Sequence, residues 1–297
     1  IASATEIVCA LGRQGKLVGR SHECDWPAGV LSLPRLTEAK FKVDGSSADI
    51  DARVQQIVRE GLSVYRVDAA ALEALAPDVI VTQDHCDVCA VSLSDVEAAT
   101  CTWTGRPVRI VSLKPDSLAD VYADIARVGA ALDATQEAEA LVDRMQKGFD
   151  ALRAASARGP RPTLAFIEWV EPMMAGGNWM PELVEIAGGR NLFGEAGKRS
   201  DWMQWEDLRA ADPDVIVVAP CGYDLKRCLE ELPVLQARPG WRDLRAVAAD
   251  RVFFADGNAY FNRPGPRLLE SAQMLQAMLR PGLPGPTGAL PSWTRAR

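Results

Sequence analysis

Hydrophobic and polar residues alternate along the chain in two recurring patterns. Short runs rich in β-branched residues, such as Val79–Thr82 and Val215–Val218, are typical of strands that are buried on both faces of a sheet. Between such runs lie amphipathic stretches with helical spacing, of which Ala48–Glu60 is one. Strands that alternate with helices in this way predict an α/β fold with parallel sheets.

Two of these patterns occur twice. The segment Leu72–Val81 consists of a helix end, a Pro-Asp turn and a strand, and it returns as Leu208–Val217. The short helix predicted over Thr5–Gly12, closed by a glycine, is echoed by Pro181–Gly188. Two halves built from the same parts predict two similar α/β lobes, with a ligand cleft between them.

A long helical stretch separates the two halves. Ser117–Ala157 contains almost only helix-forming residues, with a predicted break at Asp133–Thr135. We therefore expect an N-terminal lobe over residues 1–116, a rigid helical connector over 117–157 and a C-terminal lobe over 158–280. Residues 281–297 are rich in proline and glycine, which predicts a flexible tail.

Four further strands are predicted, at Leu17–Gly19, Val108–Ser112, Thr163–Trp169 and Arg251–Ala255, and each is followed by a loop. In open parallel sheets, ligands bind beyond the carboxyl ends of the strands. The loops that leave those ends hold both histidines and four of the seven cysteines. We expect ligand contacts from these loops, at His22, Glu23, Cys24, Asp25, Trp26, Asp84, His85, Cys86, Cys89, Trp169, Met173, Trp179, Cys221, Tyr260 and Phe261.

The same side chains allow other interpretations. His22 and His85 could be hydrogen-bonded structural residues, and Trp202 and Trp205 suit either a core or the rim of a site. The Cys86–Cys89 pair could be redox-active, half of a metal site, or buried packing thiols. Together with Cys24 and Cys221, the pair could also hold Zn²⁺ or an iron–sulfur cluster.

Composition narrows the function classes. The net charge of −7, without a run of Lys or Arg, argues against a nucleic-acid surface. The chain has no stretch of about 18 apolar residues, so we expect it not to span a membrane. Ile1 falls inside what resembles a first strand, and we therefore expect that the natural N-terminus is missing and that a signal peptide cannot be judged.

An enzyme is the alternative of a different class. Glu23 and Asp25 lie just after His22 and could perform acid–base chemistry, and a Cys–His pair could supply a nucleophile. The sequence has no nucleophile elbow, phosphate loop, zinc-protease motif or dinucleotide fingerprint. We therefore expect a binding protein rather than an enzyme.

A family resemblance sharpens this expectation. The motifs that carry it are Ser3–Ile7, Val18-Gly19, Asp25–Pro27, Pro77–Ile80, Gly188-Gly189, Pro213-Asp214 and Pro266-Arg267. In this order the chain resembles the vitamin B12 and iron-siderophore binding proteins of ABC importers, and it is most similar to the cobalamin-binding branch. The resemblance implies two Rossmann-like lobes joined by a rigid helix, a monomer located in the periplasm or otherwise outside the cytoplasm, and one ligand bound with little closure.

The resemblance also implies partners. The family docks on its permease through an acidic residue on each lobe, seven positions before the repeated proline. This position is Glu206 in the second half, whereas Ala70 stands there in the first half, with Asp68 and Glu73 nearby. We expect no intrinsic cofactor. The expected ligand is cobalamin or a related corrinoid, since the aromatic loops suit such a ring and offer few basic residues beyond Arg263 and Arg267 for a siderophore. Another metal chelate is the alternative ligand.

Overall fold

The computed structural model describes residues 1–60, 64–83, 96–97, 100, 108–280 and 292–296. These residues form two compact units, as the sequence predicts. Residues 1–45, 49–115 and 119–144 make up the first unit, and residues 46–48, 116–118 and 145–297 make up the second. The division falls inside a long helix, α6, whereas the sequence placed the lobe boundaries at the two ends of the helical stretch.

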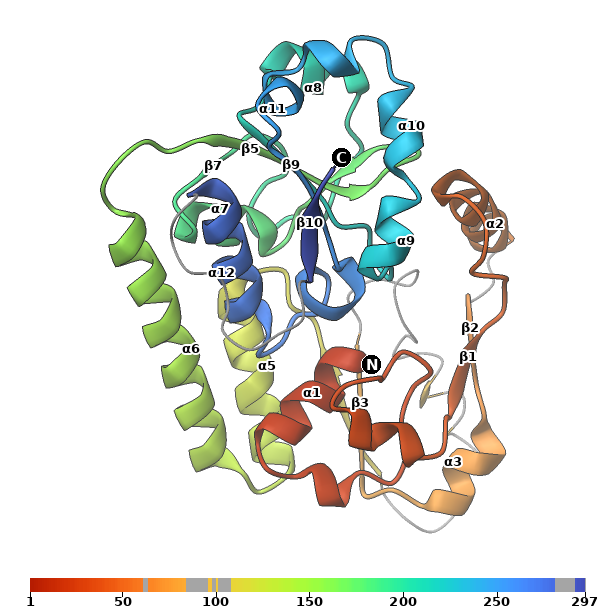
Figure 1. The fold of residues 1–297 in the computed structure, drawn as a ribbon. Helices are drawn as coiled ribbons and strands as arrows, with labels where there is room; N and C mark the ends of the chain where they lie inside the picture. The colour runs from red at the N-terminus through yellow and green to blue at the C-terminus, as the bar shows by residue number, and fades with distance from the viewer. Residues whose placement is uncertain (61–63, 84–95, 98–99, 101–107, 281–291, 297) are drawn as a thin grey trace. The chain divides into compact units, whose positions relative to one another are not determined.

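Helices and short strands alternate in the first unit (Figure 1). Its strands are β1 (Thr37–Ala39), β2 (Tyr65–Val67), β3 (Val79–Gln83) and β4 (Arg109–Leu113). Its helical segments are α1 (Ala2–Ala10), η1 (Gln14–Lys16), η2 (Ala28–Ser32), most of α2 (Ser47–Arg59), α3 (Ala69–Leu75), α5 (Leu118–Ala131) and the first part of α6 (Thr135–Ser156).

Pairing of these strands gives two small sheets in the described part of the unit. β3 and β4 are parallel over their whole length, and β1 pairs with β2 in antiparallel register. The strand predicted at Leu17–Gly19 is wrong, because these residues form no strand and only the next residue, Arg20, makes an isolated bridge, with Arg35.

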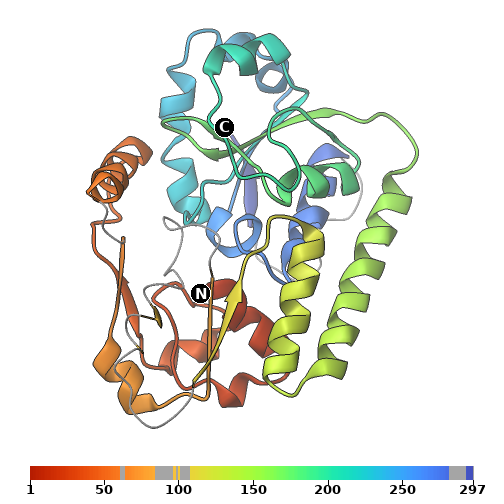
Figure 2. The same cartoon turned by 180° about the vertical axis from the view of Figure 1, so that it is seen from behind.

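The helical stretch after β4 forms two helices. α5 and the first residues of α6 run side by side, and the predicted break lies between them, where Asp133 has a positive φ of 52° (Figure 2). The two helices approach closely at Gly129, because a Cβ atom there would lie 2.5 Å from Cβ of Ala138. A glycine at position 129 therefore permits the close approach of α5 and the first part of α6.

The second unit is built on one sheet in the order β10-β9-β8-β5-β6, with β7 beside β5. Its strands are β5 (Thr163–Trp169), β6 (Met174–Ala175), β7 (Arg190–Asn191), β8 (Val215–Val218), β9 (Val252–Ala255) and β10 (Trp293–Arg295). Its helical segments are α7 (Met180–Ile186), α8 (Trp205–Ala211), α9 (Leu225–Leu229), α10 (Leu232–Gln236), η3 (Trp241–Asp243), α11 (Arg245–Ala248), the π-helical turn η4 (Gly257–Phe261) and α12 (Leu268–Leu279).

The core of the second unit is the parallel trio β5, β8 and β9. Every residue of β8 and β9 is buried, as is expected for parallel strands covered on both faces. β10 runs antiparallel along the outer edge of β9 (Figure 1). The C-terminal tail, which the sequence predicts to be flexible, therefore ends in an ordered strand, and residues 281–291 lie outside the described residues.

Candidate functional site

The loop at residues 21–27 of the first unit contains a buried thiol, Cys24. Cys24 is 1% exposed, and the Thr5 hydroxyl donates to its sulfur over 3.0 Å. The Ser21 hydroxyl lies 3.2 Å from the same sulfur. These contacts hold Cys24 against the first turns of α1 and make its thiol a partner of protein hydroxyls.

His22 in this loop is held by Thr37. The backbone nitrogen of His22 donates to the Thr37 hydroxyl over 3.0 Å, and His22 Nδ1 lies 2.8 Å from the same oxygen. The ring also packs against Tyr65, with centroids 5.3 Å apart. Burial lowers the pKa of His22 to about 4, so the imidazole is neutral at pH 7 and forms no ion pair with Glu23, 4.0 Å away.

The outer part of the loop is open to solvent. Glu23 is half-buried, whereas Asp25 is exposed and Trp26 retains 51% of its accessible surface. The exposed indole leaves Trp26 accessible for the ligand contact expected from the sequence. The other predicted contacts of the first half, Asp84, His85, Cys86 and Cys89, lie outside the described residues.

In the second unit, the predicted residue Trp169 belongs to a tilted aromatic pair. It ends β5, and its ring lies 5.2 Å from that of Tyr223, in the loop after β8. The Arg227 guanidinium lies 4.3 Å from the centre of the Tyr223 ring, and it donates to the Tyr223 hydroxyl over 3.1 Å. Burial raises the pKa of Tyr223 to about 12, so the phenol stays protonated. Trp169, the more open of the two rings, is half-buried.

Three predicted contacts lie deeper in the second unit. Trp179 donates its indole N–H to the carbonyl of Phe261 over 2.9 Å, and the Phe261 ring lies 5.4 Å from Phe166 of β5. Trp179 is 5% exposed, Met173 is 4% exposed and Phe261 is fully buried. These side chains join α7, β5 and η4 in the core of the unit.

The turn η4 follows β9 and presents Tyr260. The Asp256 carboxylate caps this turn by accepting from the backbone nitrogen of Ala259 over 2.7 Å. Tyr260 is half-buried, and the Arg267 guanidinium lies 5.0 Å from its ring centre. Arg263 is buried and donates to Asn258 over 2.9 Å. Single π-helical turns are frequent at functional sites, which makes this loop a candidate for ligand contact.

Of the four cysteines in the predicted cluster, only Cys24 and Cys221 belong to the described residues. Cys221 is half-buried, and its backbone nitrogen donates to the Glu168 carbonyl over 3.1 Å. Among the residues that the structure describes, no group of three or more His, Cys, Asp or Glu side chains could hold a metal ion. Cys86 and Cys89 fall outside those residues, so the four-thiolate site remains a hypothesis.

The predicted docking residues lie on the repeated helices. Glu206 is exposed in the first turn of α8. In α3, Glu73 is exposed, whereas the Asp68 carboxylate caps the helix by accepting from the backbone nitrogen of Ala71 over 3.0 Å. An acidic residue is therefore available on each of these helices, at different turns.

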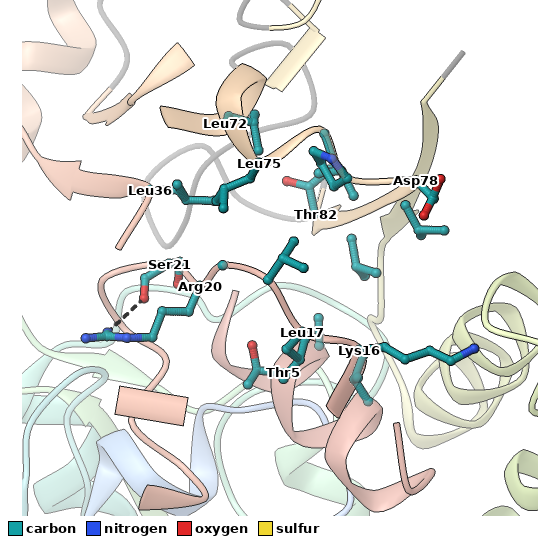
Figure 3. Close-up of a pocket in the computed structure, with 18 of the residues that line it drawn as sticks. Thr5, Lys16, Leu17, Arg20, Ser21, Leu36, Leu72, Leu75, Asp78 and Thr82 are labelled. Atoms are coloured by element: carbon teal, nitrogen blue, oxygen red, sulfur yellow. Dashed lines mark hydrogen bonds between the residues drawn. The ribbon is translucent and has the colours of Figure 1, made fainter. Parts of the chain in front are cut away.

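The first unit also contains an apolar cavity of about 480 Å³ (Figure 3). Four consecutive residues of β3, Val79–Thr82, line one wall, and consecutive residues from Lys16 to Ser21 line another. Because side chains alternate along a strand, a wall of consecutive residues means that the cavity faces the backbone edge of β3. None of the predicted ligand contacts within the described residues lines this cavity, so it is distinct from the candidate site.

The comparisons with known proteins decide the family. A family model described as periplasmic binding protein matches residues 2–259. The chain belongs to the periplasmic binding protein family. It is therefore a solute-binding protein rather than an enzyme, and membership implies a location outside the cytoplasm. No curated protein matches the chain.

Solved structures share the fold of this periplasmic binding protein. A heme-binding protein from Pseudomonas aeruginosa is 20% identical with a TM-score of 0.71, over 100% of this chain and 95% of that one. A possible iron-binding protein from Staphylococcus epidermidis is 19% identical with a TM-score of 0.71, over 94% and 95%. The vitamin B12 binding protein BtuF of Vibrio cholerae is 18% identical with a TM-score of 0.64, over 94% of both chains.

No helix in the described part of the chain combines the length and the apolar character that crossing a membrane requires. The expected partner of a binding protein of this family is an ABC importer, and the candidate site must therefore release its ligand as well as bind it.

Proposed function

We propose that this protein captures a corrinoid such as cobalamin and delivers it to an ABC importer. The observation that supports this most directly is the packing of Trp169 against Tyr223 at the carboxyl ends of β5 and β8. A corrinoid is a large ring with apolar faces, and a half-buried indole offers it an extended apolar contact.

The second candidate ligand is heme, the other metal–tetrapyrrole. Heme and vitamin B12 are the ligands named for two of the similar folds described above. Heme also carries two carboxylates, for which Arg267 beside Tyr260 would be a partner. Both ligands share a metal-centred ring, so the same aromatic loops suit either.

Calorimetric titration of the purified protein tests the proposal. We expect saturable binding of one cyanocobalamin per chain, and no binding of a ferric siderophore. Saturable binding of iron protoporphyrin with no heat from cyanocobalamin would replace the corrinoid by heme. Absence of binding to both rings would contradict the proposed function.

We also propose that Glu206 contacts the permease. It is exposed in the first turn of α8, where its charge is available to a partner. Glu206→Lys should reduce ligand-dependent uptake by the reconstituted importer, because the reversed charge repels a basic patch. Asp207→Lys, at the next exposed acid of the same turn, is the matched control. Equal loss in both variants, or loss in neither, would remove Glu206 from the docking surface.

A further inference from the structure

Three residues of the second unit, Trp169, Met174 and Trp202, are paired side by side on three neighbouring chain segments. Trp169 of β5 is the register partner of Met174 in β6, and Met174 forms an isolated antiparallel bridge with Trp202. Directly opposed residues of neighbouring strands project from the same face. Trp169, Met174 and Trp202 therefore form a continuous row, named here the Trp–Met–Trp row.

Met174 and Trp202 form a non-hydrogen-bonded pair across their bridge. Ala175 donates its backbone N–H to the Asp201 carbonyl over 3.0 Å, and Met203 donates to the Met173 carbonyl over 3.0 Å. These two bonds flank Met174 and Trp202 without using either residue. This is the arrangement in which opposed side chains of an antiparallel pair come nearest to each other.

A β-bulge places Trp169 in the row. Ile167 pairs with Ala175, but Trp169 pairs with Met174, so two residues of β5 oppose one residue of β6. A bulge of this kind redirects a side chain at the end of a strand, and bulges are over-represented beside binding and catalytic sites. The redirected Trp169 ring also packs against the buried Tyr223, in the loop after β8.

Burial distinguishes the row from its neighbours in sequence. Trp169 and Met174 are half-buried, and Trp202 is 49% exposed. Met173 and Met203, adjacent to the row in sequence, are 4% and 8% exposed. Trp205 is 5% exposed because it stacks on Trp241 and donates to the Pro239 carbonyl. The two tryptophans whose roles the sequence left open are thus separated: Trp205 belongs to the core and Trp202 to an accessible surface.

We propose that the Trp–Met–Trp row is the surface on which one ring face of a metal–tetrapyrrole stacks. This inference rests on the proposed function and adds Met174 and Trp202 to the site. Two indoles and a polarisable thioether in line give an apolar surface suited to a flat ring, and a thioether adapts its shape to the contact. Met174 lies in the middle of the row, so its side chain packs against the ring between the two indoles.

Equilibrium titrations with cyanocobalamin, iron protoporphyrin IX and metal-free protoporphyrin IX test this proposal. We expect Trp202→Ala to weaken binding of the ring that the wild-type protein binds best by about tenfold or more, since stacking and apolar contact are lost together. Trp202→Phe should recover part of this loss. Met174→Leu should weaken the metal-bearing and the metal-free ring alike, and by about threefold or less, because leucine keeps most of the apolar contact.

Two control substitutions test whether weaker binding comes from the Trp–Met–Trp row or from any change of a Met or Trp in the second unit. Met203→Leu changes the same residue type at a buried neighbour, and Trp293→Leu removes a tryptophan from β10. Both should bind within about twofold of wild type, and the exposed position of Trp202 predicts a nearly unchanged melting temperature for Trp202→Ala.

The outcomes are distinct. A wild-type protein that binds none of the three rings overturns the proposed function and the row with it. A wild-type protein that binds, with Trp202→Ala equal to wild type, overturns the row alone. Loss of only the metal-bearing ring in Met174→Leu would show sulfur–metal coordination, which contradicts the packing role assigned to Met174.

Discussion

Ala76 and Asp212 occupy equivalent positions in the two units. Each ends a seven-residue helix, α3 or α8, in the left-handed backbone conformation, with φ values of 44° and 41°. Each is followed by a Pro-Asp turn and then by a parallel strand. The internal repeat seen in the sequence is therefore a repeat of backbone geometry.

This equivalence leads to a stability prediction. A left-handed conformation costs a residue with a Cβ about 1 kcal/mol or more, and glycine avoids most of that cost. Ala76→Gly should therefore raise the free energy of unfolding by about 0.5–1 kcal/mol, measured by urea denaturation. Asp212→Gly should show no such gain, because the Asp212 carboxylate accepts from the backbone nitrogen of Arg245 over 2.8 Å. Equal gains in both would contradict this account.

Asp124 gives the protein a pH-dependent stability. Its side chain is 1% exposed in α5, and burial raises its pKa to about 6, although the Arg127 guanidinium opposes the shift. The folded state then binds more protons than the unfolded state between pH 4 and pH 6. The free energy of unfolding should fall as pH rises through this window, by up to about 3 kcal/mol. Asp124→Asn should remove this contribution, and urea midpoints measured between pH 4 and pH 6 should show the loss.

His22 has the opposite effect on the free energy of unfolding over nearly the same pH range. Its pKa falls to about 4 in the folded state, because burial disfavours the charged imidazole. The unfolded state therefore binds more protons between pH 4 and pH 6.5, and this group stabilises the fold as pH rises, by about 2–3 kcal/mol. His22→Asn retains a polar atom near Thr37 but does not titrate. Its unfolding free energy should rise less with pH than that of the wild type, and an unchanged profile would argue against the assignment.

Substitution of Trp179 distinguishes a structural role of this side chain from direct contact with the ligand. Its indole N–H donates to the Phe261 carbonyl inside the second unit. Trp179→Phe leaves this buried carbonyl without its donor, which should lower the free energy of unfolding by about 1–3 kcal/mol. Affinity for the ligand should remain close to wild type at temperatures where the variant is folded. A stable variant with weak binding would instead support the direct contact expected from the sequence.

The regular parts of the fold could be predicted because local pattern and tertiary environment agree there. The apolar runs at β3, β5, β8 and β9 are found within one or two residues of their predicted positions, and so is the break between α5 and α6. Strands β6, β7 and β10 were not predicted, because their two or three residues carry too short a pattern and are defined by their partners. Leu17–Gly19 has the apolar pattern of a strand, but it forms no ladder with another segment within the described residues.

For the candidate site residues, the sequence could predict the chain segment but not the burial of each side chain. Trp169 at the end of β5 and Tyr260 in the turn after β9 are half-buried, whereas Trp26 is exposed in a loop that follows no strand of the described residues. Sequence alone could not tell Met173 from Met174, since only the register of β6 decides which of the two points into the core. Trp202 was undecided for the same reason, as its place depends on a bridge to Met174.

The antiparallel direction of β10 has a practical consequence for surface-based binding assays. Ser292 lies beside Asp256 at the carboxyl end of β9, whereas Ala296 donates to the Val252 carbonyl at the amino end. A tether attached beyond β10 would therefore leave the sheet at the end opposite Trp169 and the turn that holds Tyr260. Immobilisation through that point should keep these two residues open to a soluble ligand.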